Sequence, residues 1–142
     1  MSDFHESQVF SVGTLNNGLS FSLRQRPGIK PYDFGKFGVT VRTGKFHGSA
    51  ECFFCRSDFE TLLLALQSLD LSLQGGHEFD PIESQLNFSI EIDKLGHLNC
   101  SGVLFEKAGG WGASVKFEIE FDQTALKPLI RNLEEFILSF DS

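Results

Sequence analysis

The sequence has 142 residues, of which 41% are hydrophobic, and this length suits one compact domain, residues 1–142, with a sizeable core. Twelve basic residues against nineteen acidic ones give a net charge of −7, which repels nucleic-acid phosphates and argues against DNA or RNA binding. No segment approaches the roughly 18 apolar residues of a membrane span, and no basic region followed by an apolar run opens the chain, so we expect a cytoplasmic protein. Three cysteines, an odd number, indicate reduced thiols.

Alternating apolar and polar residues predict four strands in the first third of the chain. Residues 9–25 contain two alternating runs around an Asn-Gly pair, which suits the tight turn of a hairpin. A loop with two prolines and two glycines follows at residues 26–35. Residues 36–54 then indicate two more strands, in which apolar side chains again share one face.

After residue 54, the spacing of the hydrophobic residues changes from every second residue to the spacing of a helix. Leucines and Phe59 recur at helical spacing over residues 58–73, and Ser57 or Asp58 can cap the predicted helix. Alternation returns beyond the glycine pair that ends this run. It predicts three strands in meander order, over residues 86–92, 97–105 and 113–121.

A second helix is predicted over residues 125–140, where one apolar stripe follows Thr124 as a candidate cap. About seven strands with clean alternation and two one-sided helices predict an α+β fold. We expect an antiparallel sheet with both helices packed on its apolar face and a second face that is at least partly wet.

The glycine-rich stretch EKAGGWGASVKF, which surrounds Trp111, could be a phosphate cradle, a lid or a turn. A phosphate-binding glycine loop normally leads from a strand into a helix, whereas this one leads from a strand into a strand. It therefore indicates a hairpin connection. Trp111 either packs back over the edge of the core or is exposed as an anchor for a partner, because tryptophan is enriched at binding hot spots.

Other groups of reactive residues lack the setting that their chemistry needs. The Cys-Phe-Phe-Cys run from Cys52 to Cys55 shows neither a thioredoxin-like setting nor a second ligand pair for zinc, so we expect buried structural thiols. A metal site from His77, Glu78 and Asp80 is a weaker alternative, since loop carboxylates are mostly solvated. The sequence indicates no cofactor and no catalytic residue.

Paired carboxylates offer the one catalytic alternative. Glu118 and Glu120 lie two residues apart on one strand and share its polar face with Lys116, and Glu91 could join them. Acidic residues on a wet sheet face are ordinary, and acid–base catalysis would need a desolvated cleft around them. The alternative hypothesis is a small enzyme or small-ligand binder that uses these carboxylates.

Several motifs together resemble a known family. They are the strand FGVTVRTGKFHGSAECFF, the leucine-rich helix DFETLLLALQSL, the turn D-x-x-G-H-L, the short tryptophan-containing loop and the helix start F-D-Q-T-x-L-x-x-L. With these features, residues 36–138 resemble the bacterial WapI-type immunity proteins and their relatives. The resemblance implies a non-catalytic protein that neutralises a toxin domain by binding it.

The main hypothesis is therefore a stoichiometric protein-binding module that acts through its polar sheet face. We predict that the partner-binding residues are Trp111, Lys116, Glu118, Glu120 and Glu91. The acidic net charge is compatible with a basic toxin domain as the partner, because opposite charges speed association.

Overall fold

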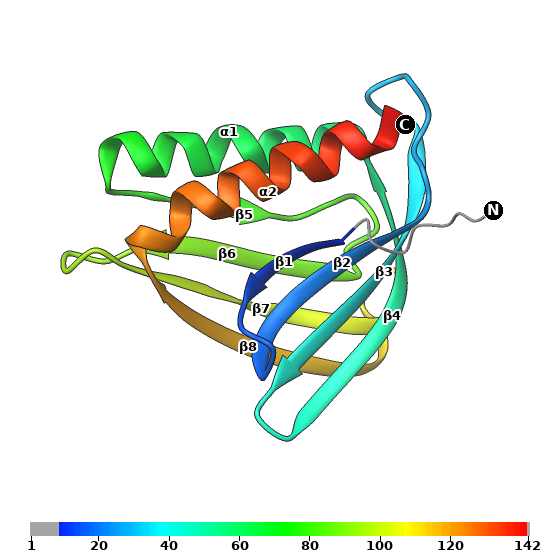
Figure 1. Ribbon diagram of the computed structural model, residues 1–142. Helices are drawn as coiled ribbons and strands as arrows, with labels where there is room; N and C mark the ends of the chain where they lie inside the picture. The colour runs from blue at the N-terminus through cyan, green and yellow to red at the C-terminus, as the bar shows by residue number, and fades with distance from the viewer. Residues whose placement is uncertain (1–8, 142) are drawn as a thin grey trace.

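The structure is a computed structural model that describes residues 9–141. Eight strands, two α-helices and two short 3₁₀-helices follow one another along this part of the chain (Figure 1). They are β1 (Val9–Gly13), β2 (Asn17–Gln25), β3 (Phe34–Thr43), β4 (Phe46–Cys55), α1 (Arg56–Ser72), β5 (Gly76–Phe79), β6 (Leu86–Ile92), β7 (His97–Lys107), β8 (Trp111–Asp122), η1 (Gln123–Ala125), α2 (Leu126–Leu138) and η2 (Ser139–Asp141).

The strands form two antiparallel sheets of four strands each, with the orders β1-β2-β3-β4 and β5-β6-β7-β8. We call them the first and the second sheet. The predicted α+β class, with antiparallel strands and two helices, is confirmed, although the strands divide between two sheets instead of forming one. Sequence analysis did not identify β5, because its four residues are too few to show a period. The chain passes through α1 between β4 and β5, and β5 then pairs with β6 instead of extending the first sheet.

Two glycines of the first sheet mark where the two sheets meet. A Cβ on Gly48 of β4 would lie 2.6 Å from a methyl group of Val115, and one on Gly13 would lie 2.8 Å from a methyl group of Ile119. Glycine at these positions therefore lets the backbone of the first sheet approach the inner face of β8. The Asn17 side chain also donates a hydrogen bond to the Glu118 carbonyl oxygen at 3.3 Å.

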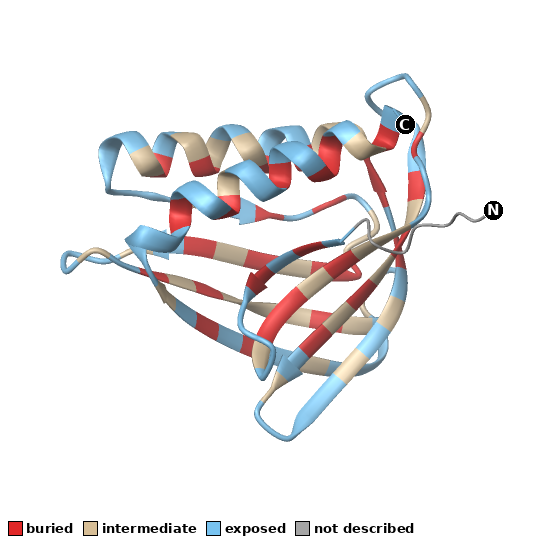
Figure 2. Cartoon of the chain, in the orientation of Figure 1, coloured by how far each residue is buried: buried red, intermediate tan, exposed pale blue. Residues whose placement is uncertain are grey.

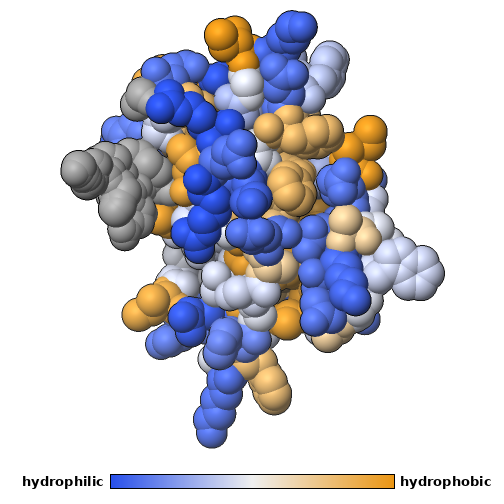
Figure 3. Space-filling model, turned by 90° about the vertical axis from the view of Figure 1, so that its right-hand side faces the viewer, coloured by the Kyte–Doolittle hydropathy of each residue, from blue (hydrophilic) through white to orange (hydrophobic). Residues whose placement is uncertain are grey.

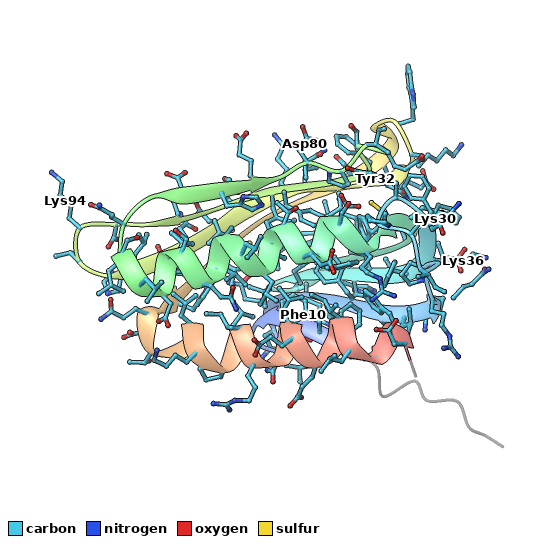
Figure 4. The ribbon with its side chains drawn as sticks, turned by 90° about the horizontal axis from the view of Figure 1, so that it is seen from above. Phe10, Lys30, Tyr32, Lys36, Asp80 and Lys94 are labelled. Atoms are coloured by element: carbon cyan, nitrogen blue, oxygen red, sulfur yellow. The ribbon has the colours of Figure 1, made fainter. Side chains whose placement is uncertain are left out.

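Both helices lie side by side over the open side of the two sheets, as Figures 1 and 4 show from two directions. Their bounds agree with the predicted ranges to within two residues at each end. Pro128 lies in the first turn of α2, where a missing N–H is tolerated. None of the helices in the described range is long and apolar enough to cross a membrane.

The helix caps differ from the prediction. Cys55, not Ser57 or Asp58, is the N-cap residue of α1, and its backbone N–H donates to the Asp58 carboxylate at 2.9 Å. Before α2, the Asp122 carboxylate accepts a hydrogen bond from the backbone N–H of Thr124 at 3.0 Å and starts η1. Asp58 therefore contributes to the cap of α1 from the third helical position, and Asp122 takes the place of the predicted Thr124.

Buried positions, red in Figure 2, recur along the helices and along the strands of both sheets, and phenylalanine rings fill much of this core. Phe59 of α1 is fully buried, and its ring centroid lies between 5.0 and 6.3 Å from six other rings. These rings belong to Phe21, Phe37, Phe54, Phe79, Phe136 and Phe140. Most of the sixteen phenylalanines of the sequence therefore lie in the core, but Phe34, Phe46 and Phe53 are exposed.

The cysteines are buried free thiols, as predicted. Cys52 lies on the inner face of β4 and Cys100 on the inner face of β7. Burial raises the pKa of both thiols to about 12, because a thiolate would lose its hydration in the core. Both therefore remain protonated and unreactive near neutral pH.

Replacing Cys52 with alanine is expected to lower the free energy of unfolding by about 1 kcal/mol, because the change removes a buried sulfur and leaves a small void. Urea denaturation measures this loss. Binding activity should be unchanged, since the thiol lies on the inner face of the sheet. Stoichiometric zinc in the purified protein, lost in the variant, would contradict a purely structural role.

Candidate partner-binding surface

The outer face of the second sheet brings the predicted carboxylates together. Glu91 on β6 lies opposite Asn99 on β7, and Asn99 lies opposite Glu120 on β8, so these three side chains form one row across the sheet. Glu118 lies in the next row and Lys116 in the row after it. Since neighbouring strands are about 4.8 Å apart, Glu91 and Glu120 are separated by about 10 Å.

These charged residues are available to a partner. All three carboxylates and Lys116 are exposed, and none forms a salt bridge with another residue in the range 9–141. The Asn99 Oδ1 atom between them is covered and has no hydrogen-bond partner among the same residues. The face carries three carboxylates and one lysine, so it favours a cationic partner.

Trp111 lies at the end of the same face, where β7 turns into β8. Its side chain is 72% exposed, which resolves the two alternatives in favour of an exposed residue. A register shift between Phe105 and Lys107 gives β8 one extra residue, so that Trp111 pairs with Lys107 and faces outward together with Phe105. Gly112 has a φ of +84° at this bulge, a conformation that suits glycine.

The glycine-rich stretch around Trp111 is a hairpin connection, as predicted. It joins β7 to β8, which pair antiparallel with each other. Its backbone is held by a hydrogen bond of 2.7 Å from the Gly109 N–H to the Glu83 carbonyl, and Ala113 N–H donates to the Glu106 carboxylate at 3.2 Å. These contacts fix the position from which Trp111 projects.

Phe105 is a residue of this surface that the sequence analysis did not single out. Its half-buried ring lies against the backbone of Gly110, where a Cβ would be 3.7 Å from the nearest ring atom. The alternation of side chains along β7 could have identified Phe105, because it lies an even number of residues from Asn99 and therefore shares its outward face. Phe105 and Trp111 make one end of the face aromatic, while the carboxylates make the rest acidic.

A shallow hollow of about 670 Å³ adjoins Lys116 and Glu118. It lies at the seam between β8 and the turns of the first sheet, so the acidic face is not flat at this border. Its lining residues are Asn16, Asn17, Thr43, Gly44, Lys116, Phe117 and Glu118.

The turn of the D-x-x-G-H-L motif closes the opposite end of the face. The Asp93 carboxylate accepts hydrogen bonds from the backbone N–H groups of His97 at 2.9 Å and Leu95 at 2.8 Å. The bond from His97 is the largest cause of the lowered pKa of Asp93, because it stabilises the charged carboxylate. Gly96 has a φ of +86°, as this tight turn requires.

The weaker alternatives receive no support from the geometry. Within residues 9–141, no group of three His, Cys, Asp or Glu side chains is placed to hold a metal ion. His77 and Glu78 are neighbours on β5 and so point to opposite faces. His77 faces the core side, and the resulting desolvation lowers its pKa. Contrary to the expectation that the Cys-Phe-Phe-Cys run lacks a redox setting, Cys55 lies at a helix N-terminus. Cys52, the other cysteine of this run, is buried on the inner face of β4.

Comparison with known proteins gives one family. The model of the immunity protein WapI-like family matches residues 14–141. The match therefore begins ahead of the region in which the motifs suggested a resemblance and includes all of β2, whereas β1 lies outside it. None of the curated proteins matches the chain at a significant level.

Proposed function

The chain belongs to the WapI-like immunity protein family, and from this premise we propose that it neutralises a toxin domain by stoichiometric, non-catalytic binding. The match over residues 14–141 is the observation that carries the proposal. Such a protein acts in the cytoplasm of the cell that must be protected. It blocks the toxin by covering a functional surface and needs no reactive group of its own.

The outer face of the second sheet is the binding surface in this proposal. It combines an exposed aromatic residue, Trp111, with the exposed carboxylates of Glu91, Glu118 and Glu120. Aromatic anchors carry much of the binding energy at protein interfaces, and charges around them steer the encounter. Lys116 lies beyond Glu118 at the border of the acidic residues and would help to fix the orientation of the partner.

The partner in this proposal is a basic protein domain. The chain carries a net charge of −7, and the carboxylates of the proposed surface point to solvent. A basic domain would be attracted over a Debye length of about 8 Å at physiological salt. Many enzymes that cut nucleic acids need a basic surface for their substrate, and an acidic protein face would compete for it.

The test uses the C-terminal domain encoded directly upstream of this chain's gene. We expect a one-to-one complex by light scattering and complete loss of toxin activity at one molar equivalent. Inhibition should not progress with time, because the protein acts by occupying the toxin. Failure to bind any upstream domain, together with turnover of a small molecule, would favour the alternative enzyme hypothesis. Inactivation of the toxin at substoichiometric amounts would contradict non-catalytic binding.

Reversing the charge of Glu118 and Glu120 to lysine is expected to slow association with the toxin, and to slow it more at low salt. Both side chains are exposed, so the change alters long-range attraction more than packing. Stopped-flow measurements at several salt concentrations give the rate constants. Reversal of Glu134 and Glu135 on α2 is the matched control, because it changes net charge equally on another part of the surface. Equal slowing by both variants would place the binding surface elsewhere.

A further inference from the structure

The two sheets belong to parts of the chain that differ in charge. Residues 9–55, which contain β1 to β4, have six basic and two acidic residues, whereas residues 56–141 have six basic and fifteen acidic ones. The inner faces of both sheets are buried in the core, so most of these charges lie on the outer faces and in the loops. The first sheet therefore carries a surface of opposite sign to the proposed toxin-binding surface.

Three lysine or arginine side chains and one carboxylate face outward from the strands of the first sheet. Along β3, Lys36 and Arg42 alternate with buried residues. The Arg24 guanidinium lies on the same face, because a Cβ on Gly38 would come within 2.7–3.0 Å of three of its atoms. The carboxylate belongs to Glu51 of β4, and it lies 3.9 Å from the Lys36 ammonium group. Both arginines are exposed, so this face can attract an acidic partner.

The first sheet lies on the right in Figure 1. Figure 3 looks at the molecule from that side and shows hydrophilic residues over much of it.

A hollow of about 310 Å³ lies on this face beside Arg42. Gly13, Gly18 and Arg42 are paired across β1, β2 and β3, and the two glycines leave the space next to the arginine open. The neighbouring row borders the hollow with three hydroxyl groups, which belong to Ser11, Ser20 and Thr40. Hydroxyl and guanidinium groups donate hydrogen bonds to carboxylates, so the hollow suits an acidic side chain of a partner.

The second sheet of the same chain supplies the matching surface. Its outer face presents the exposed carboxylates of Glu78, Glu91, Glu118 and Glu120. Each sheet has four strands, so each face spans about 14 Å between its outer strands. Contact between two such faces would bury less than about 1,200 Å² in total, the range of weak and transient interfaces. An interface of this size can be displaced by a tighter partner.

A second copy fits the cationic face better than the other candidate partners. The toxin domain of the proposed function is basic, so this face would repel it. A nucleic acid would need a continuous basic stripe, whereas Glu51 lies among the three cations. The net charge of −7 does not prevent contact between copies at physiological salt, because a Debye length of about 8 Å leaves the facing side chains as the main electrostatic contribution.

We infer that the outer face of the first sheet binds the acidic outer face of a second copy of this chain. The contact is head to tail, because the two faces that meet come from different sheets. It covers the proposed toxin-binding surface, so the toxin domain must displace the second copy. This displacement rests on the proposed function, whereas the contact between copies does not.

Sedimentation velocity on the free protein tests the contact between copies. At physiological salt, the average mass should rise above that of one chain as the protein concentration increases. Arg42→Glu should weaken this association by about ten-fold or more, because like charges would then face each other. Arg131→Glu on α2 is the matched control, since it changes the net charge equally at an exposed position away from both sheet faces.

Two results of this experiment would overturn the inference and leave the proposed function intact. One is a wild-type protein that stays monomeric at every concentration. The other is equal weakening of the association by Arg42→Glu and Arg131→Glu, because the effect would then come from net charge alone.

A mixture of two variants tests which faces meet. Arg42→Glu blocks the cationic face, and Glu118→Lys combined with Glu120→Lys blocks the acidic face. Each variant alone should associate weakly, whereas the mixture should form complexes, because each variant keeps the face that the other needs. All three positions are exposed, so circular dichroism should show unchanged folds. A mixture without complexes would overturn the head-to-tail contact.

Addition of the upstream toxin domain to the assembled wild-type protein tests the displacement. The assembly should dissociate into one-to-one complexes with the toxin, because both partners need the acidic face. A toxin complex that keeps the second copy bound would overturn the displacement. Assembly as expected, without any binding or inhibition of the toxin, would contradict the proposed function and leave the contact between copies in place.

Discussion

Replacement of Phe59 with alanine is expected to lower the free energy of unfolding by about 3–5 kcal/mol, the largest effect we predict for a single residue. Phe59 is completely buried, and its ring packs against rings from α2, from the first sheet and from β5. Alanine would leave a cavity that these rings cannot fill without leaving their rotamers. Because a domain of this size is stable by only about 5–15 kcal/mol, the variant should be partly unfolded near body temperature.

Urea denaturation monitored by circular dichroism measures this loss. Leu64→Ala is the matched control on the same helix, because Leu64 is 67% exposed and its loss should change stability by less than about 0.5 kcal/mol. A loss below about 1 kcal/mol for Phe59→Ala would contradict the central position of this ring. Equal losses for the two variants would show that α1 buries a different face.

Replacement of Trp111 with alanine is expected to weaken toxin binding by about 2 kcal/mol or more, which is about a 30-fold increase in Kd. The indole is 72% exposed in the free protein, so it has much apolar surface left to bury against a partner. The change should act through faster dissociation, as most interface substitutions do. Surface plasmon resonance separates the two rate constants.

Stability of the free protein provides the internal check for this variant. Since Trp111 projects from a hairpin held by backbone hydrogen bonds, its loss should leave the urea midpoint nearly unchanged. Leu95→Ala is the control for binding, because Leu95 is 81% exposed at the turn on the other end of β7. Figure 4 shows that this turn, marked by Lys94, lies far from the end of the molecule that carries Lys30 and Tyr32. Unchanged rates for Trp111→Ala would exclude this residue from the interface.

Much of the candidate surface follows from the sequence, because side chains of a strand alternate between its two faces wherever the strand lies. Glu118 and Glu120 had to share one face of β8, and Ile119 between them had to face the core. Alternation within each strand could not establish that Glu91 joins them, since that depends on the register of β6 and β8 against β7. Which face of the molecule binds the partner, and therefore whether the predicted residues contact it, remains a prediction.

The sequence by itself determined the elements that rest on local periodicity: both helices, the hairpins and the phenylalanine-rich core. Tertiary structure alone decided three features that rest on contacts between distant residues. The division into two sheets depends on the pairing of β5 with β6, and the position of β4 as an edge strand follows from that division. Counted by twos from Val115, Trp111 would face inward, but the bulge at Gly112 turns it outward. A bulge depends on how two strands pair, and the alternation of residues within one strand gives no information about that pairing.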